Sequence, residues 1–197
     1  GSTTQELSDK ELHRFLLTKS KISWESVCEE NVTIDDLKTS TFEKFKKLAK
    51  KRVPNIENED NETVLKKLNL VDNQGKLRRA AILLFGKEPQ RYFFSSYFKI
   101  GKFRGTTELI TDDVIEGNLF EQFDRALEIL KTKYIRLMVK GYKDWVRIEE
   151  FEYPEDVIRE AIVNALVHKD YLGSHIQMKI FEDKITLWNS GTLLTGI

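Results

Sequence analysis

The chain has 197 residues, of which 40% are hydrophobic and 32% are charged. With only three prolines and ten glycines, this composition excludes collagen-like, mucin-like and intrinsically disordered proteins and predicts a folded core. Because 32 basic and 32 acidic residues cancel to a net charge of zero, attraction to nucleic acid or to an anionic membrane has to come from a local patch.

The cysteine content and the longest apolar run bear on where the protein works. Cys28 is the single cysteine, so no internal disulfide can form, which is typical of a reducing compartment. We therefore expect a cytoplasmic protein. The longest apolar run, residues 80–85, is far shorter than the ~20 residues that a membrane-spanning helix needs. We expect no membrane partner.

The first third of the chain follows helical patterns. Ser8 followed three residues later by Glu11 makes a capping box, which predicts a helix over 7–19. Apolar residues recur at helical spacing over 41–52, where a second helix is expected, with lysines on its solvated face. A short third helix is predicted over 62–70.

The central part of the chain is predicted to contain both helices and a strand. Residues 77–85 predict a buried helix or strand, and the alanines and arginines there favour a helix. Residues 97–103 alternate between apolar and polar side chains, as in a half-buried strand. The apolar residues of 116–137 follow the 3.6-residue period, which predicts a long amphipathic helix.

The last quarter predicts one helix and one hairpin. Pro154 opens a helix that is expected to run to about residue 169, where Asp170 and Tyr171 close it. Residues 176–180 and 184–188 each alternate and flank a turn, which predicts an antiparallel hairpin.

Helices and strands that come in runs, without regular alternation, indicate an α+β fold. We expect an N-terminal helical segment over residues 1–72, followed by a two-layer α/β sandwich over 73–197 whose mainly antiparallel sheet is covered by helices.

The helix after Pro154 carries the side chains that best suit chemistry. Glu160, Asn164 and His168 are spaced i, i+4, i+8 and therefore share one stripe of that helix. An amide oxygen suits Mg²⁺, and a carboxylate can act as a general base on water. The alternative interpretation is the solvated face of an amphipathic helix, which spacing alone prefers.

Several sequence blocks resemble one protein family. The run REAIVNALVHKDY at 159–171, the predicted hairpin and the run WNSG at 188–191 resemble the C-terminal ATPase-like part of RecG-related transcriptional regulators of bacteria and archaea. The runs RAAILLFGKEPQR at 79–91 and EGNLFEQ at 116–122 are similar to the same family. In that family a Schlafen/AlbA-like DNA-binding domain usually comes first. Residues 3–76 match only loosely, so we expect a fragment that lacks most of that domain.

The resemblance implies a fold similar to the GHKL ATPases, which include gyrase, Hsp90, histidine kinases and mismatch-repair proteins. It implies ATP and Mg²⁺ as cofactors, Glu160 as the base that activates water, Asn164 as the Mg²⁺ ligand, and Asn189 to Gly191 as the turn that holds adenine. The sequence departs from the family at Asn189, where an Asp usually accepts a hydrogen bond from adenine. It also stops at Ile197, before any lid or later glycine box.

The resemblance favours a DNA-associated transcriptional regulator with an ATP-binding module, and ATP hydrolysis in the longer parent protein stays open. No G-x-x-x-x-G-K-[ST] motif is present, so a P-loop helicase motor is not expected. The alternative is a non-enzymatic DNA-binding or assembly module that keeps the fold without nucleotide. The oligomeric state is also open, a homodimer included.

A basic and aromatic segment over 77–104 is a second candidate site. It holds seven basic residues against one acidic residue, as a nucleic-acid surface needs, and the aromatic residues that interleave with them are Tyr92, Phe93, Phe94, Tyr97, Phe98 and Phe103. The nucleic-acid candidates are Arg78, Arg79, Arg91, Lys99, Lys102 and Arg104. Residues 105–130 hold seven acidic residues and one basic residue, so intramolecular neutralisation is the alternative, and the one we favour.

The spacing of His168, Asp170 and His175 could be interpreted as a metal site. Gly173 leaves the ligand geometry undetermined, and lone histidines are commonly structural, so we do not expect one.

Overall fold

The computed structural model describes residues 16–17, 20, 23–135, 137–143 and 146–191, with the backbone alone over 137–143 and 146–151. The chain divides into two compact units, Gly1–Lys87 and Glu88–Ile197. The predicted boundary after residue 72 falls inside the first unit. The predicted helix over 7–19 lies outside the described residues apart from Leu16 and Leu17.

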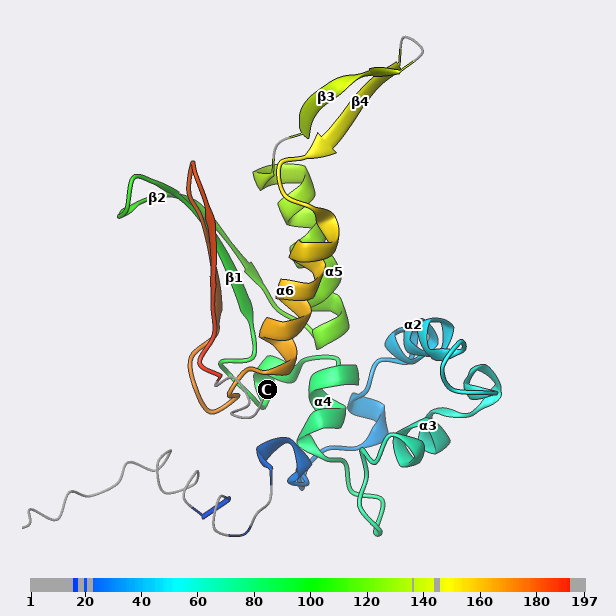
Figure 1. Cartoon of the computed structure of the whole chain (residues 1–197). Helices are drawn as coiled ribbons and strands as arrows, with labels where there is room; N and C mark the ends of the chain where they lie inside the picture. Colours follow the sequence, from blue (N-terminus) through cyan, green and yellow to red (C-terminus); the bar gives the residue numbers. More distant parts are fainter. Residues whose placement is uncertain (1–15, 18–19, 21–22, 136, 144–145, 192–197) are drawn as a thin grey trace, which may run out of the picture. The chain divides into compact units, whose positions relative to one another are not determined.

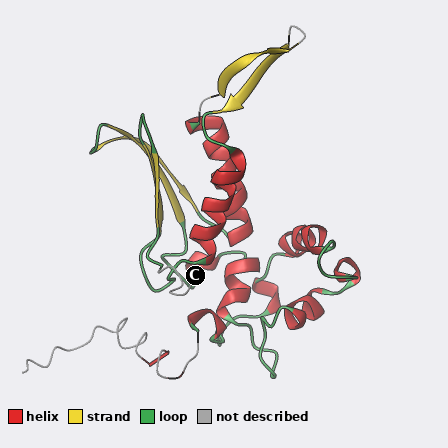
Figure 2. Cartoon of the chain, viewed as in Figure 1, coloured by secondary structure: helices red, strands yellow, loops and turns green. Residues whose placement is uncertain are grey.

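The first unit is built from three α-helices and short 3₁₀ turns in the part of the chain that the structure describes (Figures 1 and 2). The helices are α2 (Thr39–Ala49), α3 (Asn61–Lys67) and α4 (Arg79–Phe85), and the turns are Trp24–Ser26, Ile34–Asp36 and Ile56–Asn58. Phe42 of α2 stacks on Phe85 of α4, with ring centroids 4.0 Å apart. The helices predicted over 41–52 and 62–70, and the helical choice for 77–85, are confirmed.

The second unit contains a four-stranded sheet of order β2-β1-β5-β6. Its strands are β1 (Phe98–Arg104), β2 (Glu108–Ile115), β5 (Ile176–Ile180) and β6 (Ile185–Trp188). Strands β1 and β5 pair in parallel, and the two outer pairs are antiparallel. The predicted strand over 97–103 and the predicted hairpin are confirmed, whereas β2 was not predicted.

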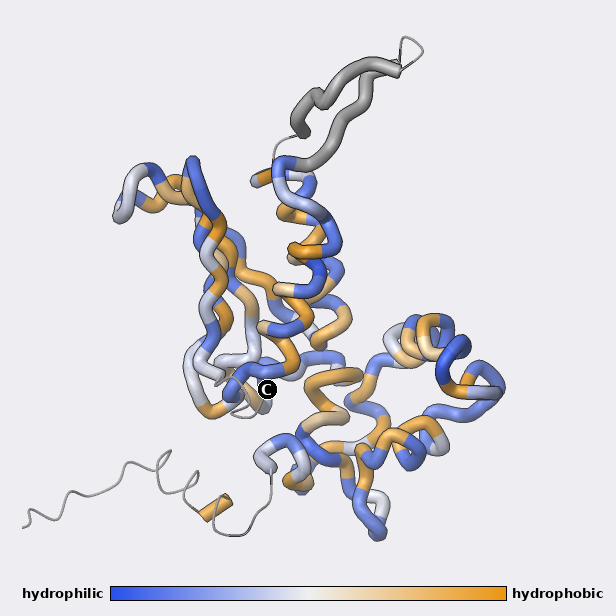
Figure 3. Tube along the Cα trace, viewed as in Figure 1, coloured by the Kyte–Doolittle hydropathy of each residue, from blue (hydrophilic) through white to orange (hydrophobic). Residues whose placement is uncertain are grey.

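Two helices cover one face of this sheet: α5 (Leu119–Ile129) and α6 (Glu155–Val167) (Figure 1). Apolar and polar stretches alternate along both helices (Figure 3). Their apolar stripes pack on the inward side chains of β1 and β5, which form one buried cluster with them. Its central members are Phe98, Ile100, Leu130, Ile162, Ile176 and Met178. The α+β fold, with helices layered on a sheet, is confirmed.

The helix predicted over 116–137 is shorter than expected. Asn118 and Glu121 form a reciprocal capping box, so α5 begins after Asn118. It continues into a π-helical turn at Leu130–Tyr134, and a strand pair follows, β3 (Leu137–Lys143) with β4 (Val146–Phe151). The helical period of Tyr134 and Leu137 therefore extended the prediction past the true end of the helix.

The entry into β1 is tied to the turn before α5 by glutamine side chains. Gln90, which lies within a 3₁₀ turn at Pro89–Arg91, donates to the Ser96 and Gly117 carbonyls and accepts from the Gly117 N–H. The buried Gln122 side chain donates to the same two carbonyls. These contacts give a structural role to parts of the runs at 79–91 and 116–122.

Within the described ranges, no helix is long and apolar enough to cross a lipid bilayer.

Candidate functional site

Helix α6 presents Glu160 and Asn164 to solvent. Both are exposed, while Ile162, Ala165 and Leu166 on the opposite stripe are buried against the sheet. Residues four apart on a helix have Cβ atoms roughly 5–6 Å apart, so the carboxylate and the amide can act on one bound group. The structure thus places these two predicted site residues together on an accessible face.

Contacts of Glu155, Arg159 and Ile162 fix the rotation of α6 about its own axis. Near its start, Glu155 forms an ion pair with Lys131, with Nζ and Oε1 2.7 Å apart. The Arg159 guanidinium lies over the Phe123 ring of α5, 5.0 Å from its centroid. Because Ile162 is also fully buried, α6 cannot turn about its axis without losing packing. The direction in which Glu160 and Asn164 point is therefore set by the fold.

Side chains from elsewhere satisfy the last carbonyls of α6. The carbonyls of a final helical turn have no partner within the helix. The Asn189 amide donates to the Ala165 carbonyl at 3.1 Å, and the Tyr171 hydroxyl donates to the Leu166 carbonyl at 2.8 Å. Tyr171 thus closes the helix end, as predicted. Burial raises the pKa of its hydroxyl far above the ordinary value, so it remains a donor.

The turn at 189–191 packs directly against this helix end. The Asn189 Oδ1 accepts from the Gly191 N–H at 2.9 Å, and the Ser190 hydroxyl donates to the Asp170 carbonyl at 3.0 Å. A Cβ on Gly191 would lie 1.7 Å from the His168 carbonyl oxygen. The fold therefore requires glycine at 191, independently of any ligand. Both ends of the Asn189 amide likewise serve the fold.

The predicted adenine turn and the predicted Mg²⁺ ligand thus meet at one end of α6. Asn189 contacts the residue that follows Asn164 in the helix, and Gly191 contacts the helix cap. An Asp at 189 could not donate to the Ala165 carbonyl, since an ionised carboxylate only accepts. An asparagine at 189 therefore suits this helix end, whereas an ionised aspartate would not.

Lys99, Lys169 and His175 lie near one another, and Lys169 shares the Asp170 carbonyl with Ser190 of this turn. The Lys169 side chain is buried, and its Nζ donates to the Asp170 carbonyl and lies 4.6 Å from the Tyr171 ring centroid. Burial lowers the pKa of His175 below its ordinary value, and Lys99 and Lys169 lower it further. His175 is therefore neutral at pH 7, in a locally positive environment.

No group of three or more His, Cys, Asp or Glu side chains suited to a metal ion occurs among the residues that are described. Asp170 accepts from the Leu172 N–H, and the His175 ring stacks on Tyr97. Asp170 and His175 therefore each make contacts within the protein.

The six nucleic-acid candidates are divided between the two units. Arg78 and Arg79 belong to the first, where Arg79 pairs with Glu29 (Nε to Oε2, 2.9 Å) and lies over the Trp24 ring. Arg78 Nε and Arg79 Nη1 are buried without a hydrogen-bond partner. These two arginines therefore serve the packing of the first unit.

Of the four basic candidates in the second unit, two form ion pairs, one lines a cavity and one is exposed. Lys99 pairs with Asp112 at 2.6 Å, and Arg104 pairs with Glu108 at 3.2 Å. Lys102 lines a cavity, and Arg91 is exposed before β1. The ion pairs fit the intramolecular alternative that the sequence offered for this segment.

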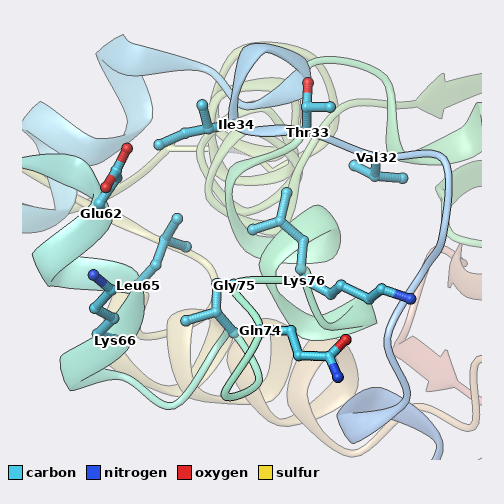
Figure 4. Close-up of a pocket in the computed structure, with 11 residues that line it drawn as sticks. Val32, Thr33, Ile34, Glu62, Leu65, Lys66, Gln74, Gly75 and Lys76 are labelled. Carbon is cyan, nitrogen blue, oxygen red and sulfur yellow. The ribbon is translucent and has the colours of Figure 1, made fainter.

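Two cavities lie away from α6's exposed stripe. One, of about 440 Å³, lies in the first unit, where buried Leu65 and Leu77 contribute to an apolar lining and Glu62, Lys66 and Lys76 are polar (Figure 4). The other, of about 430 Å³, lies in the second unit and is lined by Tyr134, Tyr153 and residues of β1 and β5, among others. Neither cavity is lined by Glu160 or Asn164.

Comparison with known proteins finds a family model that matches part of the chain and a solved structure with a similar fold. Residues 13–100 match a family described as a domain of unknown function (DUF8451). No curated protein matches the chain significantly. The crystal structure of the DIP2311 protein from Corynebacterium diphtheriae is similar, with a TM-score of 0.64 at 19% sequence identity. The alignment covers 98% of this chain and 38% of that one, so this chain spans well under half of its relative's length. At this identity the similarity shows the fold alone.

Proposed function

We propose that this chain is part of a DNA-associated transcriptional regulator related to the RecG-related proteins, and that α6 contributes to an ATP·Mg²⁺ site. The observation that carries the proposal is the exposed pair Glu160 and Asn164, held on a fixed helix beside the turn at 189–191. A packed amphipathic helix does not need a carboxylate and an amide aligned next to a glycine turn. A site for a phosphorylated ligand gains from both.

The donor set on α6 fits this cofactor. The Asn164 Oδ1 is a hard oxygen ligand of the kind that Mg²⁺ prefers, and bound Mg²⁺ would neutralise phosphate charge. Glu160, one turn earlier, would hold and polarise a water molecule as a general base. The Asn189 Oδ1 accepts one hydrogen bond from Gly191 and keeps a second lone pair, which can accept from an adenine amino group.

In the same proposal the parent protein works in the cytoplasm, is not embedded in a membrane, and meets DNA through regions beyond this chain. The free thiol of Cys28 fits a reducing compartment. A homodimer is compatible with this arrangement.

The test is equilibrium binding of a fluorescent ATP analogue with and without Mg²⁺, using the chain and a parent protein extended beyond Ile197. We expect saturable, Mg²⁺-dependent binding that Asn164→Ala weakens at least about tenfold, because a charge-assisted contact is lost. Glu160→Gln should keep binding and lose any hydrolysis. Glu128→Gln, the same chemical change at an exposed site on α5, is the matched control. Absence of binding by the unmodified proteins would refute the proposal.

A non-enzymatic DNA-binding or assembly module is the second candidate. The observation that favours it is that Asn189 and Gly191 are both fully accounted for by contacts to the end of α6. In that case nucleotide binding should be absent, and duplex DNA binding should show a steep salt dependence. Charge reversal at Arg91, Lys99 and Lys102 should flatten that dependence, and a flat salt profile of the unmodified protein would refute this candidate.

A further inference from the structure

The face of the sheet that points away from α5 and α6 carries rings and lysines; we call it the outer face. Side chains alternate along a strand, so the residues beside the buried inward ones lie there. They are Lys99, Gly101 and Phe103 of β1, Asp112 and Val114 of β2, Gln177 and Lys179 of β5, and Thr186 and Trp188 of β6. The register places Trp188 opposite Gln177, and Gln177 beside Lys99.

Aromatic rings lie at both ends of this face. Phe103 stacks on Phe181, with centroids 5.6 Å apart, and its ring lies over Gly101, where a Cβ would be 3.1 Å from it. At the other end Tyr97 stacks on His175 at 4.4 Å. The strand between them spans roughly 20 Å at about 3.3 Å per residue.

Trp188 is the most accessible ring of the outer face. It ends β6, and it keeps 49% of its surface exposed. Val114 and Leu109 of β2 are also exposed to a similar degree. The exposed face of the Trp188 indole is therefore accessible for stacking by a planar ligand.

Lysine side chains lie next to the rings at one end of this face. Lys179 lies 5.7 Å from the Phe103 ring centroid, and Lys184 lies 5.6 Å from the Phe181 ring centroid. Lys99 pairs with Asp112, which is the acidic residue on the strand positions of this face. Basic side chains are thus interleaved with rings over the same strands.

We propose that the outer face binds single-stranded nucleic acid, with bases stacked on Trp188 and the two ring pairs and phosphates neutralised by Lys179 and Lys184. Every unpaired base offers a face to an aromatic ring, whereas duplex bases are already stacked on one another. A second copy of this chain is a poorer occupant, because a symmetric contact would bring the same lysines of both copies together.

This inference adds a nucleic-acid surface on this chain to the DNA-contacting regions proposed beyond it, and it does not depend on nucleotide binding at α6. Glu160 and Asn164 lie on a helix that covers the opposite side of the sheet (Figure 1). Variants of the two surfaces therefore test the two proposals separately.

The experiment measures binding of fluorescent 20-nucleotide single strands and of the matched duplex to the full chain by anisotropy, over a series of salt concentrations. We expect saturable binding of the single strand in preference to the duplex. Trp188→Ala should weaken it about tenfold, and Trp188→Phe should restore most of the affinity because a ring remains. Lys179→Glu should weaken binding and lower the salt slope by about 0.7 or more, while Lys47→Glu on α2 should leave it unchanged.

Three results would overturn the proposal. They are no binding of the single strand at low salt, equal or tighter binding of the duplex, or binding that the Trp188 and Lys179 variants leave unchanged. Sedimentation of the free chain adds a further result: a dimer that Trp188→Ala dissociates would assign the outer face to a second copy instead. Asn164→Ala should not alter strand binding, so loss of nucleotide binding alone leaves this inference standing.

Discussion

The middle of α6 and its C-terminal end are one turn apart and are built in opposite ways. In the middle, Glu160 and Asn164 are exposed on a stripe directed away from the core. At the end, the carbonyls accept hydrogen bonds from Asn189 and Tyr171, and the His168 carbonyl occupies the space beside Gly191. The end positions the helix, and the middle is left free for chemistry.

The predicted site residues therefore fall into two groups: residues that the fold itself requires, and residues that it leaves exposed. Asn189 and Gly191 are explained by the fold whether or not nucleotide binds, whereas Glu160 and Asn164 are exposed and no contact among the described residues requires them. Stability measurements should therefore respond strongly to the helix end and weakly to the middle, and nucleotide binding should respond to the middle.

The largest expected effect is that of Gly191→Ala. Because the new Cβ would lie 1.7 Å from the His168 oxygen, the turn at 189–191 must separate from the helix. We expect a loss of more than about 3 kcal/mol in the free energy of unfolding, measured by urea titration. Gly105→Ala is the control. Its φ is +58° but a Cβ there meets no neighbour, so it should cost only about 1 kcal/mol. Equal losses for the two variants would show that the close contact with the His168 carbonyl oxygen does not determine the need for glycine at 191.

Asn189→Asp should come next. The carboxylate cannot donate to the Ala165 carbonyl, and a negative charge at a helix C-terminus is unfavourable. We expect a loss of about 2 kcal/mol at pH 7. The loss relative to the unmodified chain should shrink at pH 3, where the carboxyl is protonated and can donate. A pH-independent loss would show that the Asn189 amide does not cap α6.

A smaller effect is expected for Asp113→Asn, which tests a site away from α6. Hydrogen bonds from Lys133 and Tyr134 hold the pKa of Asp113 below its ordinary value of 3.8. Its contribution is therefore fully present above the pKa of the unfolded chain and is lost as pH falls through the lower folded pKa. The substitution should cost about 1 kcal/mol near pH 7 and progressively less in acid, as followed by thermal unfolding from pH 7 to pH 2.

The smallest effect on stability belongs to Asn164→Ala. The side chain is exposed, and alanine favours helix, so the free energy of unfolding should change by no more than ~0.5 kcal/mol. Thermal unfolding without nucleotide is the measurement. A loss of 2 kcal/mol or more would make Asn164 a structural residue, and it would break the contrast between the two parts of the helix.

The sequence predicted the elements whose signals are local. The apolar stripe of α2 and that of α6 each lie within a dozen residues, and both helices form as expected. Strand β2 gave a misleading signal because three of its apolar residues, Leu109, Ile110 and Val114, are exposed. A register shift opposite Lys102 and Phe103 also interrupts its alternation.

The candidate site was predictable in part for the same reason. Helical spacing alone puts Glu160 beside Asn164. The cap from Asn189 and the packing of Gly191 link segments more than twenty residues apart, so only the structure shows that these residues hold the helix end. The opposite net charges of residues 77–104 and 105–130 can be counted in the sequence. Which basic residue pairs with which acidic residue depends on strand register, as it does for Lys99 and Asp112.

The parallel pairing of β1 with β5 constrains the order in which the second unit can assemble. β1 and β2 can form a hairpin as soon as residue 115 is made, but the other edge of β1 has no partner until residues 176–180 follow. Because closing so long a loop is slow, a growing chain exposes an unpaired strand edge and the apolar residues Phe98 and Ile100 during that interval. Folding yield should therefore depend on the speed of synthesis and on chaperones that shield this edge.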